Sequence, residues 1–188
     1  MSTARRCLLS RALWCSLLLT LSVMAQNQTP PAPQKLSLAA ALVLTPEFCA
    51  TVNKMGHEKF PVGKTACTEL EPVLKGIFTS LTRVDDSSKA GDAQVVLEPK
   101  FADLATHHGF NSRELVVLVE WTVRDQSGKV VWIETVQGSA NRHLGTAFTY
   151  RSNLKHIMED SVQDMAEQSA AKMSSSPQLL KVSTQPVK

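Results

Sequence analysis

Hydrophobic and polar residues alternate most regularly in the stretch ELVVLVEWTVRDQSGKVVWIETVQG, residues 114–138. In its first half every second residue is apolar, namely Leu115, Val117, Val119, Trp121 and Val123. A period of two is typical of a strand that buries one face. The DQSG segment contains Gly128 and is typical of a tight turn, and Val130, Trp132 and Val136 continue the pattern beyond it. The stretch therefore predicts a β-hairpin.

Two other segments have the longer period of a helix. The first begins near Thr68 and has one apolar face made of Leu70, Val73, Leu74, Ile77, Phe78 and Leu81. Thr68 and Glu71 form the pattern of a capping box, which would place Pro72 in the first turn. The second helix spans about 147–173, and its buried stripe is expected to comprise Leu154, Ile157, Met158, Val162, Met165, Ala166, Ala170 and Met173.

The remaining periodic segments predict strands. Residues 38–45, LAAALVLT, form an apolar run that Pro46 closes. Residues 93–105 alternate as a strand interrupted at Pro99, which favours an edge position or a bulge. The resulting order is β-α-(β)-β-β-β-α. We therefore expect an α+β fold with a mostly antiparallel sheet and two helices packed on one of its faces.

The start of the chain has the pattern of an export signal. Three arginines precede the apolar run 13–23, and small residues precede Gln26 where a signal peptidase would cut. Residues 1–25 are therefore predicted to be a signal peptide, although its retention as an anchor stays open. No later stretch is long and apolar enough to form a membrane-spanning helix.

Composition separates the folded unit from its flanks. The Pro/Gln-rich segment 26–35 is predicted to be a disordered tether, and the polar segment 174–188 is predicted to be a disordered tail. Residues 36–173 remain, and this length suits a single domain.

Removing the signal peptide also removes the net charge. The chain has 20 Lys+Arg and 17 Asp+Glu, and the first 25 residues hold three arginines and no acid, which leaves 17 of each sign. A nucleic-acid-binding surface is expected to show a basic excess or a basic stripe. Neither is visible, so we expect no binding to nucleic acid.

The order of the predicted elements resembles the small α/β modules of bacterial envelope proteins. These include the amino-terminal domain of TolB, the curli-secretion lipoproteins and the penicillin-binding-protein activators. The likeness covers about 38–173 and rests on IFTSLTRVD (77–85), DAQVVLEPKF (92–101) and VEWTVRDQSGKVVW (119–132). It implies a periplasmic, non-enzymatic protein that contacts envelope machinery. Unlike many members, this chain has no lipidation cysteine, which leaves outer-membrane anchoring open.

Cys49 and Cys67 are the two cysteines beyond the predicted signal peptide. In an exported protein such a pair favours a disulfide, here around 17 intervening residues. A pair of free thiols and a reactive thiolate at Cys67 stay open as alternatives. His57 could join the cysteines as a third metal ligand, but no short Cys or His spacing organises such a site. We therefore expect a disulfide, no metal or cofactor and no catalytic residue.

Trp121 and Trp132 are the remaining candidates for ligand contact. They could stack on a sugar or a peptide, but tryptophans on adjacent strands are also typical of sheet packing. We expect an exported binding protein that engages an envelope protein by strand addition, with the Pro99 strand as the candidate edge. One alternative is a small-ligand carrier or sensor whose pocket, between sheet and helices, is lined by these tryptophans. A thiol-dependent enzyme is a third possibility.

Overall fold

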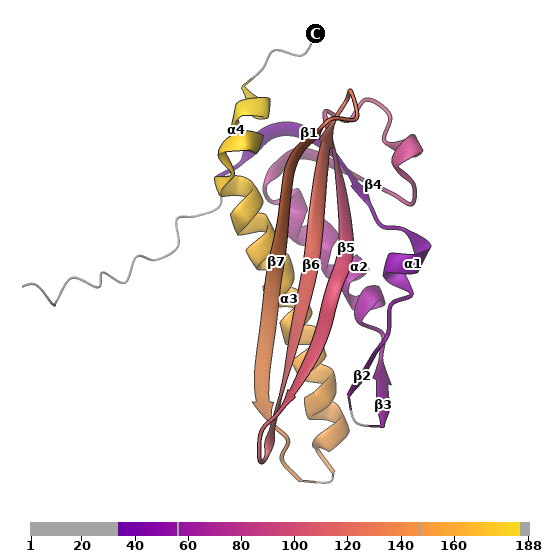
Figure 1. Ribbon diagram of the computed structural model, residues 1–188, viewed down its shortest axis with the longest axis vertical. Coiled ribbons are helices and arrows are strands. Elements are labelled where there is room, and N and C mark those ends of the chain that lie inside the picture. Colours follow the sequence, from indigo (N-terminus) through magenta and orange to yellow (C-terminus); the bar gives the residue numbers. More distant parts are fainter. Residues whose placement is uncertain (1–33, 56, 147, 185–188) are drawn as a thin grey trace, which may run out of the picture. The chain divides into compact units, whose positions relative to one another are not determined.

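The fold is built on a five-stranded sheet in which the strands lie in the order β4-β1-β5-β6-β7 (Figure 1). The computed structural model describes residues 34–55, 57–146 and 148–184. The strands of this sheet are β1 (Leu36–Val43), β4 (Phe78–Val84), β5 (Val95–His108), β6 (Ser112–Asp125) and β7 (Val130–His143). β1 pairs in parallel with β4 and β5, whereas β5, β6 and β7 pair antiparallel. Because the antiparallel ladders run along three long strands, the sheet is mostly antiparallel, as predicted.

Two helices, α2 (Val62–Lys75) and α3 (Tyr150–Ser175), lie on one face of this sheet (Figure 1). α3 contacts β6 and β7, while α2 contacts α3 and β4. The short elements are α1 (Pro46–Cys49), β2 (Asn53–Met55), β3 (Glu58–Phe60), η1 (Ser87–Lys89) and α4 (Pro177–Ser183). The predicted α+β class is therefore confirmed.

The β6–β7 hairpin forms as the alternating pattern predicts. Val119 pairs with Val136, and the alternating apolar residues of β6 are fully buried on the side of the helices. The Asp125 N–H donates to the Lys129 carbonyl at 2.9 Å and closes the turn. Gly128 adopts a φ of 80°, which is the left-handed conformation that glycine tolerates best.

The predicted start of the first helical segment, near Thr68, is wrong. α2 begins at Val62, so Thr68 lies inside the helix, and its hydroxyl donates to the Lys64 carbonyl at 3.0 Å instead of capping an end. Pro72 is likewise inside the helix. The early start depends on a tertiary contact, because the Gly63 N–H donates to the Thr51 carbonyl at 2.9 Å. A local capping pattern cannot reveal such a contact.

The predicted end of this helix is also wrong. α2 ends at Lys75, and Phe78–Val84 forms the edge strand β4 instead of another helical turn. The apolar residues at 77, 78 and 81 match a helical period, but FTSLTRV is rich in β-branched residues. Pairing with β1, for example Leu81 opposite Ala40, satisfies the backbone of this segment.

The long helix α3 matches its prediction closely. All eight residues of the expected apolar stripe are buried. The sequence pattern did not identify the buried serines on the same face, Ser161 and Ser169. The Ser161 hydroxyl donates to the Leu115 carbonyl of β6 at 3.0 Å, which joins the helix to the sheet.

The expected disordered tail is corrected over much of its length. α3 continues to Ser175, and α4 follows at once, with the Ser176 hydroxyl accepting the Leu179 N–H. The Leu179 side chain is fully buried, and α4 contacts β1, β7 and α3. The predicted signal peptide and nearly all of the predicted tether lie outside the described residues. None of the helices in the described segments has the length and low polarity required to cross a membrane.

Candidate functional site

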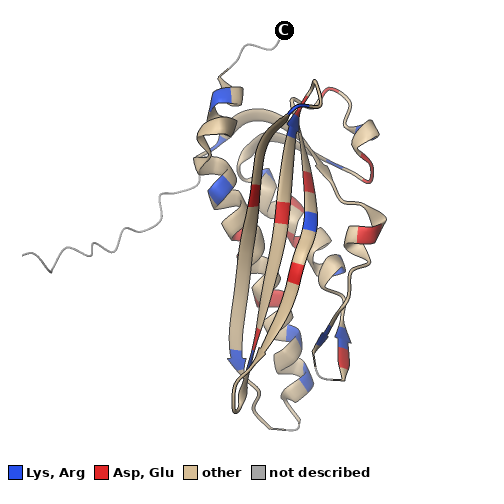
Figure 2. Ribbon diagram, in the orientation of Figure 1, with Lys and Arg blue, Asp and Glu red and all other residues tan. Residues whose placement is uncertain are grey.

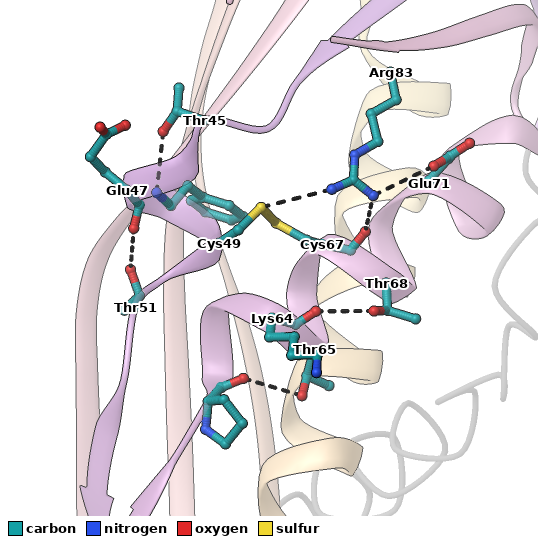
Figure 3. Close-up of a disulfide and its surroundings, with 12 residues drawn as sticks. Thr45, Glu47, Cys49, Thr51, Lys64, Thr65, Cys67, Thr68, Glu71 and Arg83 are labelled. Carbon is teal, nitrogen blue, oxygen red and sulfur yellow. Dashed lines mark hydrogen bonds and ion pairs between the residues drawn. A yellow bond between two sulfur atoms is a disulfide. The ribbon is translucent and has the colours of Figure 1, made fainter. Parts of the chain in front are cut away.

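Cys49 and Cys67 form a disulfide with an S–S distance of 2.01 Å and a Cα–Cα distance of 5.8 Å (Figure 3). Cys49 is the last residue of α1, and Cys67 lies in the second turn of α2. The bond therefore joins the two helices at the end of β1 nearest α1. Both sulfur atoms are used in this bond, so neither cysteine is available as a nucleophile or as a metal ligand in this state.

Arg83 of β4 lies beside this disulfide (Figure 3). Its Nη1 donates to the Cys67 carbonyl at 3.3 Å, and its Nη2 lies 3.9 Å from the Cys49 Sγ. Its guanidinium also lies 3.9 Å from the Glu71 carboxylate. α1, α2 and the edge strand β4 are thus held together by one covalent bond and one arginine. This arrangement braces the fold and presents no reactive group.

The three residues weighed above as possible metal ligands, Cys49, Cys67 and His57, do not form a ligand set. Within residues 34–55, 57–146 and 148–184, no group of three or more His, Cys, Asp or Glu side chains is placed to hold a metal ion. His57 lies in the connection between β2 and β3, away from the sulfur atoms, which are bonded to each other. His107 and His108 are the last two residues of β5.

The two candidate tryptophans lie in the core. Trp121 is fully buried, and its Nε1 donates to the Ser169 hydroxyl at 2.9 Å. Trp132 is 6% exposed and pairs with Val123, which puts it on the same face of the sheet as Trp121. Protein side chains fill the space between sheet and helices at this point, so the indoles have no face for a ligand.

A groove lies elsewhere, between the first turns of α2 and α3. It has a volume of about 790 Å³, and its apolar floor includes Phe60 and Met158. Its rim carries four basic side chains and two acidic ones, Lys59, Lys64, Arg151, Lys155, Glu69 and Glu159. The rim therefore has a net positive charge of two. It is an amphipathic surface depression with a basic rim.

The second feature of interest is the outer edge of β5. β1 pairs with β5 only at Val95–Leu97, and α1 covers the next part by stacking Phe48 on Phe101 at 4.4 Å. Within the described residues no strand pairs with the outer side of Asp103–His108, which we call the open edge. Pro99 lies just past the end of the β1 ladder, so β5 is internal at its start and an edge strand beyond it.

The backbone of the open edge presents donors to solvent. The Gly109 N–H donates across the turn to the Ser112 carbonyl at 3.1 Å, so it points toward β6. N–H groups alternate in direction along a strand, which turns those of Thr106 and His108 away from β6. The Leu104 N–H fits this pattern, because it donates to the Asp103 carboxylate at 2.8 Å.

The far edge of the sheet is less available. On β7 the Ser139 N–H, which a neighbouring strand would otherwise use, donates to the Asp164 carboxylate of α3 at 2.9 Å. Ion pairs between Arg142 and Asp160 and between Lys172 and Glu134 close α3 further onto this strand. α3 therefore protects β7, whereas no described residue covers the open edge of β5 in this way.

Solved structures from several bacteria share this fold, although no protein-family model matches the chain and no curated protein matches it. Protein XCC0632 from Xanthomonas campestris, which has the family model DUF330, is similar with a TM-score of 0.52 at 8% identity over 77% of this chain and 91% of its own. Protein CT253 from Chlamydia trachomatis has a TM-score of 0.51 at 12% identity, and the match covers 73% of this chain and 96% of that protein. A Helicobacter pylori protein described as a neuraminyllactose-binding hemagglutinin homolog has a TM-score of 0.50 at 12% identity. This match covers 80% of this chain and 91% of that protein. At these identities the likeness concerns the fold alone.

Proposed function

We propose that the chain is an exported accessory protein of a bacterial cell envelope that has no enzymatic activity and binds a protein partner along the open edge of β5. The export pattern of residues 1–25 and the disulfide both support an oxidising compartment outside the cytoplasm. The likeness to the TolB amino-terminal domain and its relatives remains a prediction that agrees with this compartment.

The observation that carries the proposal is that no described strand pairs with the outer side of Asp103–His108, whose other side pairs with β6. An extended peptide adds to such an edge through main-chain hydrogen bonds, and side-chain pockets then select the sequence. The bulge at Ala102 and the exposed charge of Asp103 restrict this pairing. Bulges and charges of this kind protect edges against indiscriminate association. A partner strand must therefore match the remaining donors, those of Thr106 and His108.

The small-ligand alternative has weaker support. Both tryptophans that it requires are buried in the core. The groove between α2 and α3 is large enough for a ligand, but it lies outside the space between sheet and helices where the alternative places a pocket.

A single proline substitution in the open edge tests the proposed binding of a partner strand. Thr106→Pro removes an N–H that points away from β6, so it is expected to abolish capture of the partner from envelope extracts while the thermal unfolding curve stays close to the parent's. Thr106→Val is the matched control, because it keeps the N–H and a β-branched side chain. Equal capture by the proline variant and the parent would contradict the proposal, as would loss of capture in the valine variant.

A further inference from the structure

Two phenylalanine side chains project from one end of the fold, and the part of the chain that the structure describes does not cover them. Phe110 is 109% exposed and Phe148 is 98% exposed, whereas the other large hydrophobic residues among those described reach 60% at most. Phe110 lies in the turn between β5 and β6, and Phe148 lies in the loop between β7 and α3. These loops are neighbours, because the Leu144 N–H donates to the Asn111 carbonyl at 2.9 Å. We call Phe110 and Phe148, with residues 109–111 and 144–146, the aromatic pole.

Hydrogen bonds hold both loops in place. The Asn153 amide of α3 donates to the carbonyls of His143 and Leu144, at 3.2 and 3.0 Å. The Leu144 side chain is buried, which anchors the start of the loop in the core. On the other loop the Arg113 guanidinium donates to the carbonyls of Gly109 and Ser112, at 3.2 and 2.9 Å. These hydrogen bonds anchor the β5–β6 turn and the start of the loop that follows β7.

The residues around the aromatic pole are basic. The nearby described segments are 53–55, 57–60, 107–114, 141–146 and 148–160. Glu58 of β3 pairs with Arg151 of α3 at 3.3 Å, and the Leu144 N–H donates to the Asn111 carbonyl, so these segments meet at this end of the fold. Described residues of these segments include six basic and four acidic side chains, which are Lys54, Lys59, Arg113, Arg142, Arg151, Lys155, Glu58, Glu114, Glu159 and Asp160. All five histidines of the chain lie in the same segments. Figure 2 shows the basic residues at the end of β7 and the start of α3.

The net charge of this end is thus about +2 with neutral histidines, although the predicted exported chain has a formal charge of zero. Among the described residues no ion pair involves Lys54, Lys59 or Arg113, so these cations are available to an external anion. The same end of the molecule therefore combines unpaired positive charge with two protruding aromatic side chains.

We propose that the aromatic pole docks on an anionic membrane surface, with Phe110 and Phe148 inserted among the lipid headgroups. Apolar side chains that enter the headgroup region, next to cations that contact anionic lipid, give reversible binding to a membrane surface. A stable interface with a protein partner would bury about 800 Å² of this protein's own surface. Two separate side chains on convex loop tips offer little of that surface, whereas a fluid interface adapts to them.

Vesicle sedimentation of the exported form, beginning at residue 26, tests this inference. The parent is expected to bind vesicles of 70% phosphatidylcholine and 30% phosphatidylglycerol about tenfold more tightly than pure phosphatidylcholine vesicles, and to lose this preference at high salt. Phe110→Ser with Phe148→Ser should lower the partition coefficient by about tenfold for each phenylalanine removed.

Two matched controls separate the pole from general surface effects. Ile133→Ser removes a 60% exposed side chain from the open face of the sheet and should leave vesicle binding unchanged. Lys59→Glu should weaken binding about tenfold or more, while Lys129→Glu, in the β6–β7 turn away from the pole, should weaken it by less than threefold. The thermal unfolding curves of all variants identify any that fail to fold.

Depth measurements provide a second readout. Phe110→Trp and Phe148→Trp are expected to be quenched by brominated lipids, whereas Ile133→Trp is not. The proposal is overturned if the parent does not bind the anionic vesicles at low salt, or if it binds both vesicle types equally. It is also overturned if the double serine variant binds as the parent does. None of these outcomes depends on the open edge of β5, which is tested by capture of a protein partner.

Discussion

The Trp121 indole of β6 donates its Nε1–H to the Ser169 hydroxyl of α3 at 2.9 Å, and both side chains are fully buried. The Ser169 hydroxyl in turn donates to the Met165 carbonyl at 2.7 Å. A buried indole N–H needs an acceptor, and here the acceptor is supplied by a helix more than 40 residues further along the chain. This contact sets the depth at which α3 lies on the sheet.

Ser169→Ala should lower the free energy of unfolding by about 1–3 kcal/mol, because it leaves the Trp121 N–H buried without an acceptor. Urea unfolding followed by tryptophan fluorescence measures this loss. Ser175→Ala, an exposed position on the same helix, is the matched control and should change stability by less than about 0.5 kcal/mol. Equal effects of the two substitutions would show that the Trp121 hydrogen bond contributes nothing.

Gly138→Ala should destabilise the fold by about 3 kcal/mol or more. A Cβ at Gly138 would lie 2.2 Å from the Met165 nitrogen and 2.4 Å from the Ser161 carbonyl oxygen, both of which are backbone atoms of α3. The helix must move away from β7 to admit the methyl group, which loses packing along the interface.

The comparison substitution is Gly76→Ala, at the end of α2, where φ is −67° and an added Cβ would lie 3.2 Å from the Val73 carbonyl oxygen. Alanine has a higher helix propensity than glycine, so the change should be within about 1 kcal/mol of neutral. Chemical denaturation of both variants and the parent measures their free energies of unfolding. A Gly138→Ala variant as stable as the parent would contradict the close packing of β7 on α3.

Loss of the disulfide should lower stability without unfolding the protein. The Cys49–Cys67 bond closes a short loop, and the chain-entropy model gives it about 3 kcal/mol. Cys49→Ala with Cys67→Ala should therefore lower Tm by about 10 °C in differential scanning calorimetry. A reductant should lower the Tm of the parent by a similar amount and leave the double variant unchanged. If reductant has no effect on the parent, the bond is absent or contributes nothing.

The β6–β7 turn should make part of the stability depend on acid pH. The pKa of Asp125 is lowered below its ordinary value of 3.8, chiefly because its carboxylate accepts a hydrogen bond from the Ser127 hydroxyl. Backbone N–H groups of Ser127 and Lys129 add to this effect. A group with a lowered pKa in the folded state stabilises the fold above its unfolded pKa, and this contribution is lost as the pH falls through the folded pKa.

Asp125→Ala should therefore flatten the fall in unfolding free energy between pH 5 and pH 2, compared with the parent. Urea midpoints across this range provide the measurement. Asp92→Ala is a suitable control at an exposed position near the same end of β5. A parent-like pH profile in Asp125→Ala would contradict the assigned hydrogen bonds of the turn.

The elements whose pattern spans a complete face were predictable from sequence. The β6–β7 hairpin and the apolar stripe of α3 follow from periods of two and of three to four, because each element buries one whole face. The boundaries of α2 were not predictable in this way. Gly63 fixes the start of the helix by a contact with Thr51, and β4 forms because β1 offers it a partner. α4 escaped prediction because a single buried side chain, that of Leu179, ties it to the fold.

The candidate sites were predictable to different degrees. The Cys49–Cys67 pairing follows from the export pattern and the number of cysteines. The edge character of the Pro99 strand was anticipated, but the position of the open edge depends on where β1 stops pairing with β5. The aromatic pole could not be found from sequence, because the segments that carry Phe110 and Phe148 come to the same end of the fold only when the β5–β6 turn meets the loop after β7.

The most direct test of the proposed function is site-specific photo-crosslinking in living cells. A benzoylphenylalanine residue is placed at Asp103 or at His108, which are exposed at the two ends of the open edge, and at Glu120 on the solvent-exposed face of β6 as the control. Binding by strand addition predicts that one envelope protein is crosslinked from both edge positions and not from Glu120. Crosslinks from Glu120 alone, or none from either edge position, would contradict the proposal that this protein binds its partner along β5.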